Sequence, residues 1–185
     1  MSANALSVGT KSLLIGAHWP PHIAMVILAW RWLYGEWPTW RETIAICLHD
    51  IGYLGCEQMD GDDGTRHPEL GARVARRLLG EGYDDLIRGH SKGYADLVGL
   101  PLSRLYGPDK LSHAFEIAWC YVLRTRLTGE LRQYRGTLWG ENRHDDSVVS
   151  DRDWFRVIRC RMVRGGIHHA LTITAPNGLG EARGR

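Results

Sequence analysis

Apolar residues recur at helical spacing along most of this chain, and this periodicity constrains the fold more than any other feature. After the Pro20–Pro21 pair, whose fixed φ suits a first helical turn, the apolar residues fall at positions i, i+3, i+4 and i+7: Ile23, Val26, Ile27 and Trp30. Convincing β-type alternation is missing, although residues 154–163 leave helix and strand both open. The sequence therefore predicts an all-α fold.

Local signals give the approximate limits of the helices. Thr39 followed by Glu42 forms a capping-box pattern. We expect helices from Pro20, from Thr39 to about His49, from Pro68 to about Gly80, over 84–90 and, the longest, over 108–127. Polar loops are expected over 56–66 and 91–107, and these loops, helped by the C-terminal segment, should build a substrate pocket.

Length and charge limit the class of protein. With 185 residues and 44% hydrophobic content, the chain is long enough for one domain with a sizeable core. A net charge of +2 argues against a role in coating nucleic acid. We expect a helical domain over 1–140, a C-terminal extension over 141–175 that packs on it, and a flexible tail over 176–185.

Cysteine usage and hydropathy favour a cytoplasmic protein. The four cysteines lie far apart without a CxxC pair, so no disulfide framework is expected. The apolar run before His18 is too short for a signal peptide, and the stretch 23–30 is too short to span a bilayer. We therefore expect no membrane partner. Several of the eight tryptophans lie within 19–40, which predicts a Trp-rich packing face or an interface of a homo-oligomer.

The His49–Asp50 pair is the first sign of chemistry. An imidazole and a carboxylate side by side at the end of an apolar helix are suitable ligands for a divalent cation. Further candidate ligands stand at or near the ends of other predicted helices: His22, His67, His90 and Asp109. Helical bundles build metal sites from side chains of several helices in this way.

This order of ligands resembles the HD superfamily of metal-dependent phosphohydrolases. The resemblance covers roughly residues 15–127 and includes the phrases HDIG (49–52), HPELGA (67–72) and DKLS (109–112). It is closest to compact two-metal members, such as the bacterial hydrolases of symmetrical dinucleoside tetraphosphates, and more distant from the HD-GYP phosphodiesterases. It implies a helical bundle of about six to seven helices.

The resemblance also implies the ligand set and the reaction. His22, His49, Asp50 and Asp109 would hold one ion, and His67 and His90 a second, with Asp50 bridging. The ions would be two divalent transition metals (iron, manganese, cobalt, nickel or zinc). A metal-activated hydroxide would cleave a phosphoester or phosphoanhydride of a small, nucleotide-like substrate. A single-ion site, with His67 and His90 in other roles, stays open.

One departure from the family pattern concerns the cation near the substrate. Many relatives have Lys after the HDxG segment, where this chain has Tyr53. Arg66, Lys92 and Lys110 are the nearest replacements, and we expect Arg66 and Lys92 to act with Asp50 in catalysis. Two other functions stay open: a mixed-valent di-iron oxygenase, which uses the same ligands, and a non-catalytic nucleotide-binding module.

The remaining histidines have weaker patterns. His18 competes with His22 as a ligand but precedes two prolines, so His22 is favoured. His113 lies four residues after Asp109 and is expected to be either a substrate contact or a core residue. Three others show no partner pattern and are predicted to be surface residues: His144, His168 and His169.

Overall fold

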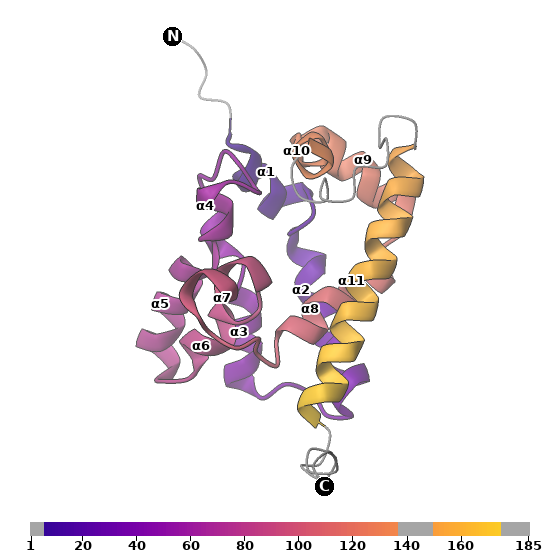
Figure 1. The fold of residues 1–185 in the computed structure, drawn as a ribbon. Coiled ribbons are helices and arrows are strands. Elements are labelled where there is room, and N and C mark those ends of the chain that lie inside the picture. The colour runs from indigo at the N-terminus through magenta and orange to yellow at the C-terminus, as the bar shows by residue number, and fades with distance from the viewer. Residues whose placement is uncertain (1–5, 137–149, 175–185) are drawn as a thin grey trace, which may run out of the picture.

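The computed structural model describes residues 6–136 and 150–174, and these residues form helices joined by turns, without a strand (Figure 1). The all-α prediction is confirmed. In chain order the elements are α1 (Val8–Ile15), α2 (Pro20–Tyr34), α3 (Trp40–Leu48), the 3-10 helix η1 (Ile51–Tyr53), α4 (Asp62–Thr65), α5 (Pro68–Leu79), α6 (Tyr83–Arg88), α7 (Lys92–Val98), α8 (Tyr106–Ser112), the 3-10 helix η2 (His113–Phe115), α9 (Ala118–Thr128), α10 (Glu130–Gly136) and α11 (Asp151–Thr174).

Several helix ends follow the local sequence signals. The Thr39 hydroxyl accepts a hydrogen bond from the Glu42 backbone N–H at 3.3 Å, and the Glu42 carboxylate accepts one from the Thr39 backbone N–H at 2.8 Å. This capping box begins α3. Helix α5 ends before Gly80, whose φ of 97° is a conformation that side chains disfavour.

The expected long helix over 108–127 is wrong. The structure has α8, η2 and α9 in its place, with Glu116 extended at the break (φ −73°, ψ 132°). The buried Glu116 carboxylate accepts hydrogen bonds from Arg124 at 2.9 and 3.1 Å, and the Glu116 carbonyl accepts one from Arg159 at 2.9 Å. These partners stabilise the bend, a tertiary effect that helical periodicity does not contain.

The expected loops are more helical than predicted, so six to seven helices is too few. Helix α4 lies within 56–66 and α7 within 91–107. Residues 154–163, where a strand was possible, lie inside α11, which is the longest described helix at 24 residues. The predicted tail over 176–185 and the first part of the predicted C-terminal extension, residues 141–149, lie outside the described residues.

Helix α8 holds a central position. It packs against α2 on one side and against α11 on the other, and α11 runs along one side of the molecule (Figure 1). Helices α3, α5 and α6 pack together as a second group, and α1 and α10 pack with α9. The ends of α3, α5 and α6 therefore approach α2 and α8 in the middle of the fold.

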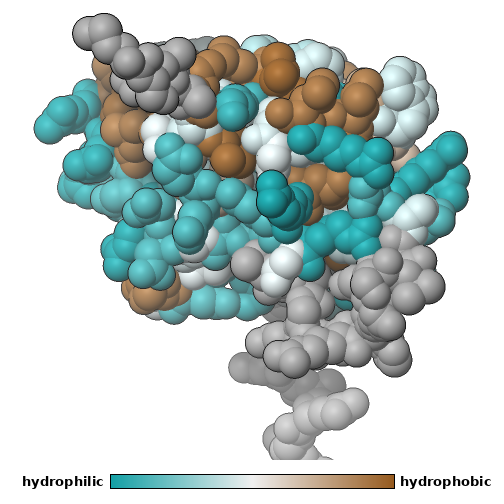
Figure 2. All heavy atoms as spheres, turned by 90° about the horizontal axis from the view of Figure 1, so that it is seen from above, coloured by the Kyte–Doolittle hydropathy of each residue, from teal (hydrophilic) through white to brown (hydrophobic). Residues whose placement is uncertain are grey.

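The tryptophans do not form the predicted packing face. Trp30 is fully buried with Val26, Ile46 and Leu105, but Trp32, Trp37 and Trp40 are 65%, 59% and 64% exposed. Further exposed apolar side chains lie on and beside α9: Ile117, Trp119, Leu123 and Leu127. Seen from above, hydrophobic residues gather mainly in the upper part of the view, while hydrophilic residues cover much of the rest of this face (Figure 2).

Among the described residues, no single helix is both long and apolar enough to cross a bilayer. Helices α1 and α2 reach that length and hydropathy only as a pair, bent by 63° at the break between them.

The Glu130 carboxylate ties the N-terminal segment to α10. It is fully buried and accepts hydrogen bonds from the Ser12 hydroxyl at 2.5 Å, the Thr128 hydroxyl at 2.5 Å and the Ala17 backbone N–H at 3.2 Å. Burial alone would raise the pKa of Glu130, but hydrogen bonding and the charge of His18 outweigh it and lower that pKa below 4.5. The carboxylate therefore stabilises the folded state in its ionised form.

This linkage predicts a pH-dependent loss of stability in Glu130→Gln. The pKa of Glu130 is lower in the folded than in the unfolded chain. The ionised carboxylate therefore contributes fully to the free energy of unfolding at pH values above its pKa in the unfolded chain. This contribution disappears as pH falls through its pKa in the folded chain. We expect the variant to be about 2–3 kcal/mol less stable at pH 7, with a difference that shrinks below about pH 4.5. Urea unfolding at several pH values measures this, and a difference independent of pH would contradict it.

Candidate metal centre

The six predicted ligands lie together in the interior, although they come from five separate parts of the chain. His22 stands in the first turn of α2, and Asp109 in α8. His49 and Asp50 follow α3 directly, His67 precedes α5, and His90 follows α6 by one residue. All six are at most 7% exposed. Side chains at or near the ends of these helices therefore place four imidazoles and two carboxylates in one buried cluster.

One oxygen of Asp50 faces the first group of ligands. Asp50 Oδ2 lies 2.9 Å from His49 Nε2 and 3.6 Å from His22 Nε2. Asp109 Oδ1 joins this group, at 3.3 Å from His22 Nε2 and 3.8 Å from His49 Nε2. Although they lie close together, three buried atoms here make no hydrogen bond of suitable geometry: His22 Nε2, His49 Nε2 and Asp50 Oδ2. Unpaired buried polar atoms that converge in this way are costly unless a ligand satisfies them.

The other oxygen of Asp50 faces the second group. Asp50 Oδ1 lies 3.4 Å from both His67 Nε2 and His90 Nε2, and the two Nε2 atoms are 3.1 Å apart. The ligand atoms of His22, His49 and Asp50 all lie within 4.8 Å of one another, as do those of Asp50, His67 and His90. Each group could hold a metal ion, and Asp50 is common to both.

Backbone carbonyls orient three of the imidazoles. The Nδ1–H groups of His49, His67 and His90 donate to the carbonyls of Ile46, Gly64 and Ile87 at 2.6, 2.6 and 2.5 Å. A carbonyl only accepts, so each ring carries its proton on Nδ1. The Nε2 atom of each ring is therefore directed towards Asp50 as a potential electron-pair donor. Metal-binding histidines are commonly fixed by such a bond to the opposite nitrogen.

The two groups differ in their proton affinity. Burial opposes the charged form of His49, but the Asp50 and Asp109 carboxylates outweigh it and raise the pKa of His49 to about 10. In the second group burial dominates, lowering the pKa of His67 to about 4 and also the pKa of His90. The second group thus presents neutral imidazoles at pH 7, while binding a cation at His49 would release a proton.

Two glycines of the quoted motifs allow the ligand-bearing segments to meet. A Cβ at Gly52 would lie 1.9 Å from the His67 carbonyl oxygen, and one at Gly71 would lie 2.1 Å from the Leu48 carbonyl oxygen. Both neighbours are backbone atoms, which cannot rotate away. The HDIG and HPELGA segments therefore contribute close packing of η1 and α3 against α5, as well as ligands.

A second layer of polar contacts holds α5, α6 and α7 together. Arg88 donates to both carboxylate oxygens of Glu69, from Nε at 3.1 Å and from a terminal nitrogen at 3.2 Å. It also donates to Asp84 at 2.9 Å, and the Tyr94 hydroxyl donates to Glu69 at 2.6 Å. Because Glu69 follows His67 closely and Arg88 precedes His90, this network fixes the relative positions of the second pair of imidazoles.

A cavity of about 730 Å³ adjoins the cluster and is lined by His22, Asp50, His67, His90 and Asp109. Lys110 lines it as well, with Nζ 2.7 Å from Asp109 Oδ2. Tyr53 is buried and stacks on the His67 ring at 4.1 Å and 11°. The Tyr53 ring therefore packs against a ligand and supplies no charge.

The structure separates the predicted cations. Arg66 is exposed and is not among the residues that line the cavity. Lys92 does line it, but its ammonium is exposed and lies 2.5 Å from the Asp96 carboxylate. The ammonium group of Lys110 lies beside the cluster, so Lys110 is better placed than Arg66 or Lys92 to contact a substrate there. The cavity also reaches Arg161 of α11, a residue without any sequence signal for a site.

The other histidines divide into three kinds. His18 and His113 both line the cavity, and burial lowers the pKa of His113 to about 3. His168 is exposed, as predicted. His169 is half-buried and bonds to the Ser103 carbonyl at 3.0 Å, so its prediction as a plain surface residue is wrong. His144 lies outside the described residues.

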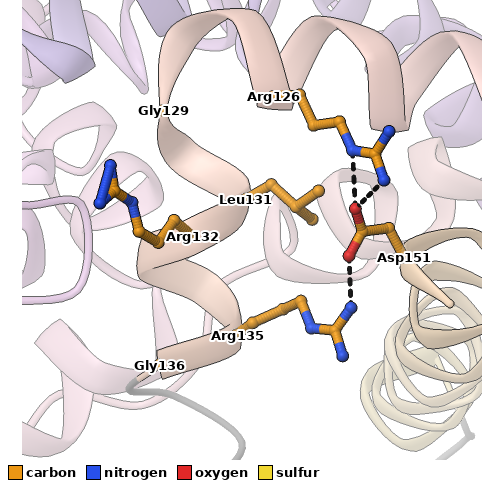
Figure 3. Close-up of a pocket in the computed structure, with 7 residues that line it drawn as sticks. All are labelled: Arg126, Gly129, Leu131, Arg132, Arg135, Gly136 and Asp151. Carbon is orange, nitrogen blue, oxygen red and sulfur yellow. Dashed lines mark hydrogen bonds and ion pairs between the residues drawn. The ribbon is translucent and has the colours of Figure 1, made fainter. Parts of the chain in front are cut away.

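A second hollow, of about 620 Å³, lies between α9, α10 and the start of α11. Two of its three arginines are already paired, because the Asp151 carboxylate accepts hydrogen bonds from Arg126 and Arg135 (Figure 3). Arg132 points away from this pair in the same view. The hollow contains neither histidine nor cysteine, so the ligand chemistry is concentrated in the first cavity.

Comparisons with known proteins do not extend this description. No protein-family model matches the chain, and neither the curated proteins nor the solved structures contain a significant match. The geometry by itself establishes a buried histidine–aspartate cluster, in an all-α fold, that is suited to holding metal.

Proposed function

We propose that this chain is a metal-dependent phosphohydrolase of the HD type, which cleaves a phosphoester or phosphoanhydride bond of a small, nucleotide-like substrate. Support comes from the order of the ligands along the chain, His22, His49–Asp50, His67, His90 and Asp109, together with their convergence at one buried cluster. Helical bundles that bind two metals use inward-facing carboxylates and imidazoles from several helices in the same manner.

The observation that carries the proposal is the position of the Asp50 carboxylate. One of its oxygens faces His22 and His49, and the other faces His67 and His90. A carboxylate placed in this way can bridge two cations, whereas a site for one ion would need only the first group. The unpaired buried atoms His22 Nε2, His49 Nε2 and Asp50 Oδ2 fit a cation at the first position.

In this proposal His22, His49, Asp50 and Asp109 hold the first ion, and Asp50, His67 and His90 the second. Two such ions would supply Lewis acidity towards a phosphoryl group and a nucleophile derived from water. The chain contributes fixed ligand geometry, because backbone carbonyls orient the imidazoles. Lys110 contributes positive charge at the same wall of the cavity, where it neutralises Asp109 and would attract a phosphoryl oxygen.

The test is a panel of phosphate compounds with the metal-free protein reloaded with manganese, iron, cobalt or nickel in turn. The panel should contain nucleoside monophosphates, dinucleoside polyphosphates and simple phosphomonoesters. We expect hydrolysis that requires added metal and is equal in air and under nitrogen, measured as released phosphate for the monoesters and as released nucleotide for the dinucleoside polyphosphates. Absence of both products with every metal would contradict the proposal.

Oxygen dependence separates the proposal from its closest competitor. A di-iron oxygenase could use the same histidines and aspartates, and its turnover would require both iron and dioxygen. A non-catalytic nucleotide-binding module would bind substrates in the panel without releasing phosphate. The same panel, run with an oxygen electrode and a binding measurement, therefore distinguishes all three functions.

A further inference from the structure

The cavity beside the candidate metal centre has two kinds of wall. Imidazoles, carboxylates and Lys110 form the wall next to the cluster. The other wall is mostly apolar and aromatic, with Asp60 and Arg161 as its charged members. Its apolar and aromatic residues come from α9, α10, α11 and the segment before α4: Tyr121, Tyr134, Trp154, Ile158, Met162 and Met59. We call this second part the aromatic compartment.

The aromatic compartment is a rigid part of the fold. Tyr121, Trp154 and Ile158 are at most 7% exposed and belong to one hydrophobic cluster, against which Tyr134 and Met162 pack. The Tyr121 ring stacks on Phe155 at 3.9 Å and 13°. Walls fixed by core packing in this way keep their shape without a ligand, which lowers the entropic cost of binding one.

Trp154 adds a polar group that has no partner. Its side chain is 5% exposed and lines the cavity, but its Nε1–H makes no hydrogen bond. A buried indole N–H usually finds an acceptor. An acceptor supplied by a ligand in the compartment would satisfy this donor.

We propose that the aromatic compartment receives the organic part of the substrate. Given the proposed phosphohydrolase function, the substrate is then a phosphorylated compound whose aromatic ring system carries a hydrogen-bond acceptor. The phosphoryl group lies at the metal cluster beside Lys110, the ring lies against Tyr121 and Met162, and the acceptor faces Trp154 Nε1. Aromatic and methionine side chains are well suited to the faces and edges of such a ring. Specificity then resides mainly in α9, α10 and α11, outside the helices that carry the candidate ligands.

Equilibrium binding of phosphonates tests the compartment without turnover. With manganese-loaded protein, we expect 1-naphthylphosphonate to bind about 50-fold more tightly than methylphosphonate, because its ring removes apolar surface from water. In Met162→Trp, a larger side chain fills the compartment, and this preference should fall below about 5-fold while methylphosphonate binds as before. Val157→Trp on the same helix is the control, since Val157 is half-exposed and does not line the cavity.

Trp154→Phe tests the unpaired donor. It keeps an aromatic side chain but removes the N–H, so we expect affinity for a coumarin phosphonate, whose ring carries a carbonyl acceptor, to fall about 5- to 10-fold. Binding of the naphthyl compound, which lacks an acceptor, should change less than 2-fold. An equal loss for both ligands, or none for either, would overturn the role given to Trp154.

Phosphate release from the corresponding phosphate esters separates this inference from the proposed function. A preference for the naphthyl phosphonate that Met162→Trp removes, in a protein that releases no phosphate, would support the compartment and refute hydrolysis. Phosphate release by a protein that binds both phosphonates equally, or whose preference survives Met162→Trp, would refute the compartment and leave hydrolysis standing.

Discussion

Asp50→Asn is expected to prevent the protein from holding two ions and to lower phosphate release by about 1,000-fold or more. Asparagine has nearly the same shape as aspartate but only one acceptor oxygen. Because Asp50 faces a different pair of imidazoles with each oxygen, the amide nitrogen must face one pair, where it donates a hydrogen bond and cannot bind metal. The loss of negative charge weakens the remaining position as well.

Metal analysis after reloading and dialysis measures the first effect, and initial rates with saturating manganese measure the second. His168→Ala is the matched control, because His168 is an exposed histidine of α11 outside the cavity, and we expect it to retain full metal content and rate. Circular dichroism verifies that both variants are folded. A normal rate in folded Asp50→Asn would remove the basis of the proposed function.

Gly71→Ala is expected to destabilise the protein by about 3 kcal/mol and to weaken metal binding at the same time. A Cβ at Gly71 would lie 2.1 Å from the carbonyl oxygen of Leu48, the residue before His49. Relief of this overlap requires α5 to move away from α3, and overpacking of this kind typically costs several kcal/mol. The same movement separates His67, at the start of α5, from His49 and Asp50.

Gly93→Ala provides a control of opposite sign. Gly93 lies in α7, and the nearest atom to an added Cβ there is a methyl carbon of Thr65 at 3.9 Å, an ordinary contact. Alanine restricts the unfolded chain and favours helix, so we expect a gain of about 0.5 kcal/mol. Urea unfolding of both variants gives the comparison. Equal free energies of unfolding for Gly71→Ala and Gly93→Ala would contradict the prediction, because they would mean that α5 can move away from α3 without loss of stability.

The fold class was predictable from the sequence because it depends on local information. Helical periodicity, the Thr39 capping box and glycines such as Gly80 act within a few residues. The six candidate ligands were named from residue type, order and the motifs of the family resemblance, and the structure places all six in one buried cluster. The motifs contained no information on the distance between any two of these residues.

Other features depended on contacts between distant segments. The break at Glu116 requires Arg124 and Arg159, and the exposure of Trp32 and Trp40 depends on where α2 and α3 pack. Without these contacts a continuous helix over 108–127 and a Trp-rich packing face were the natural predictions. Periodicity reports which face of a helix is apolar, whereas burial depends on what the rest of the chain brings to that face.

The sequence by itself determined that this protein is helical and which side chains are candidate metal ligands. Only the tertiary structure decided that Asp50 lies between two pairs of imidazoles, that Lys110 and not Arg66 adjoins them, and that α9, α10 and α11 together line the aromatic compartment. Secondary structure and motifs arise from neighbours in the chain. The shape and charge of a cavity arise from segments a hundred residues apart, whose meeting is set by the packing of the whole core.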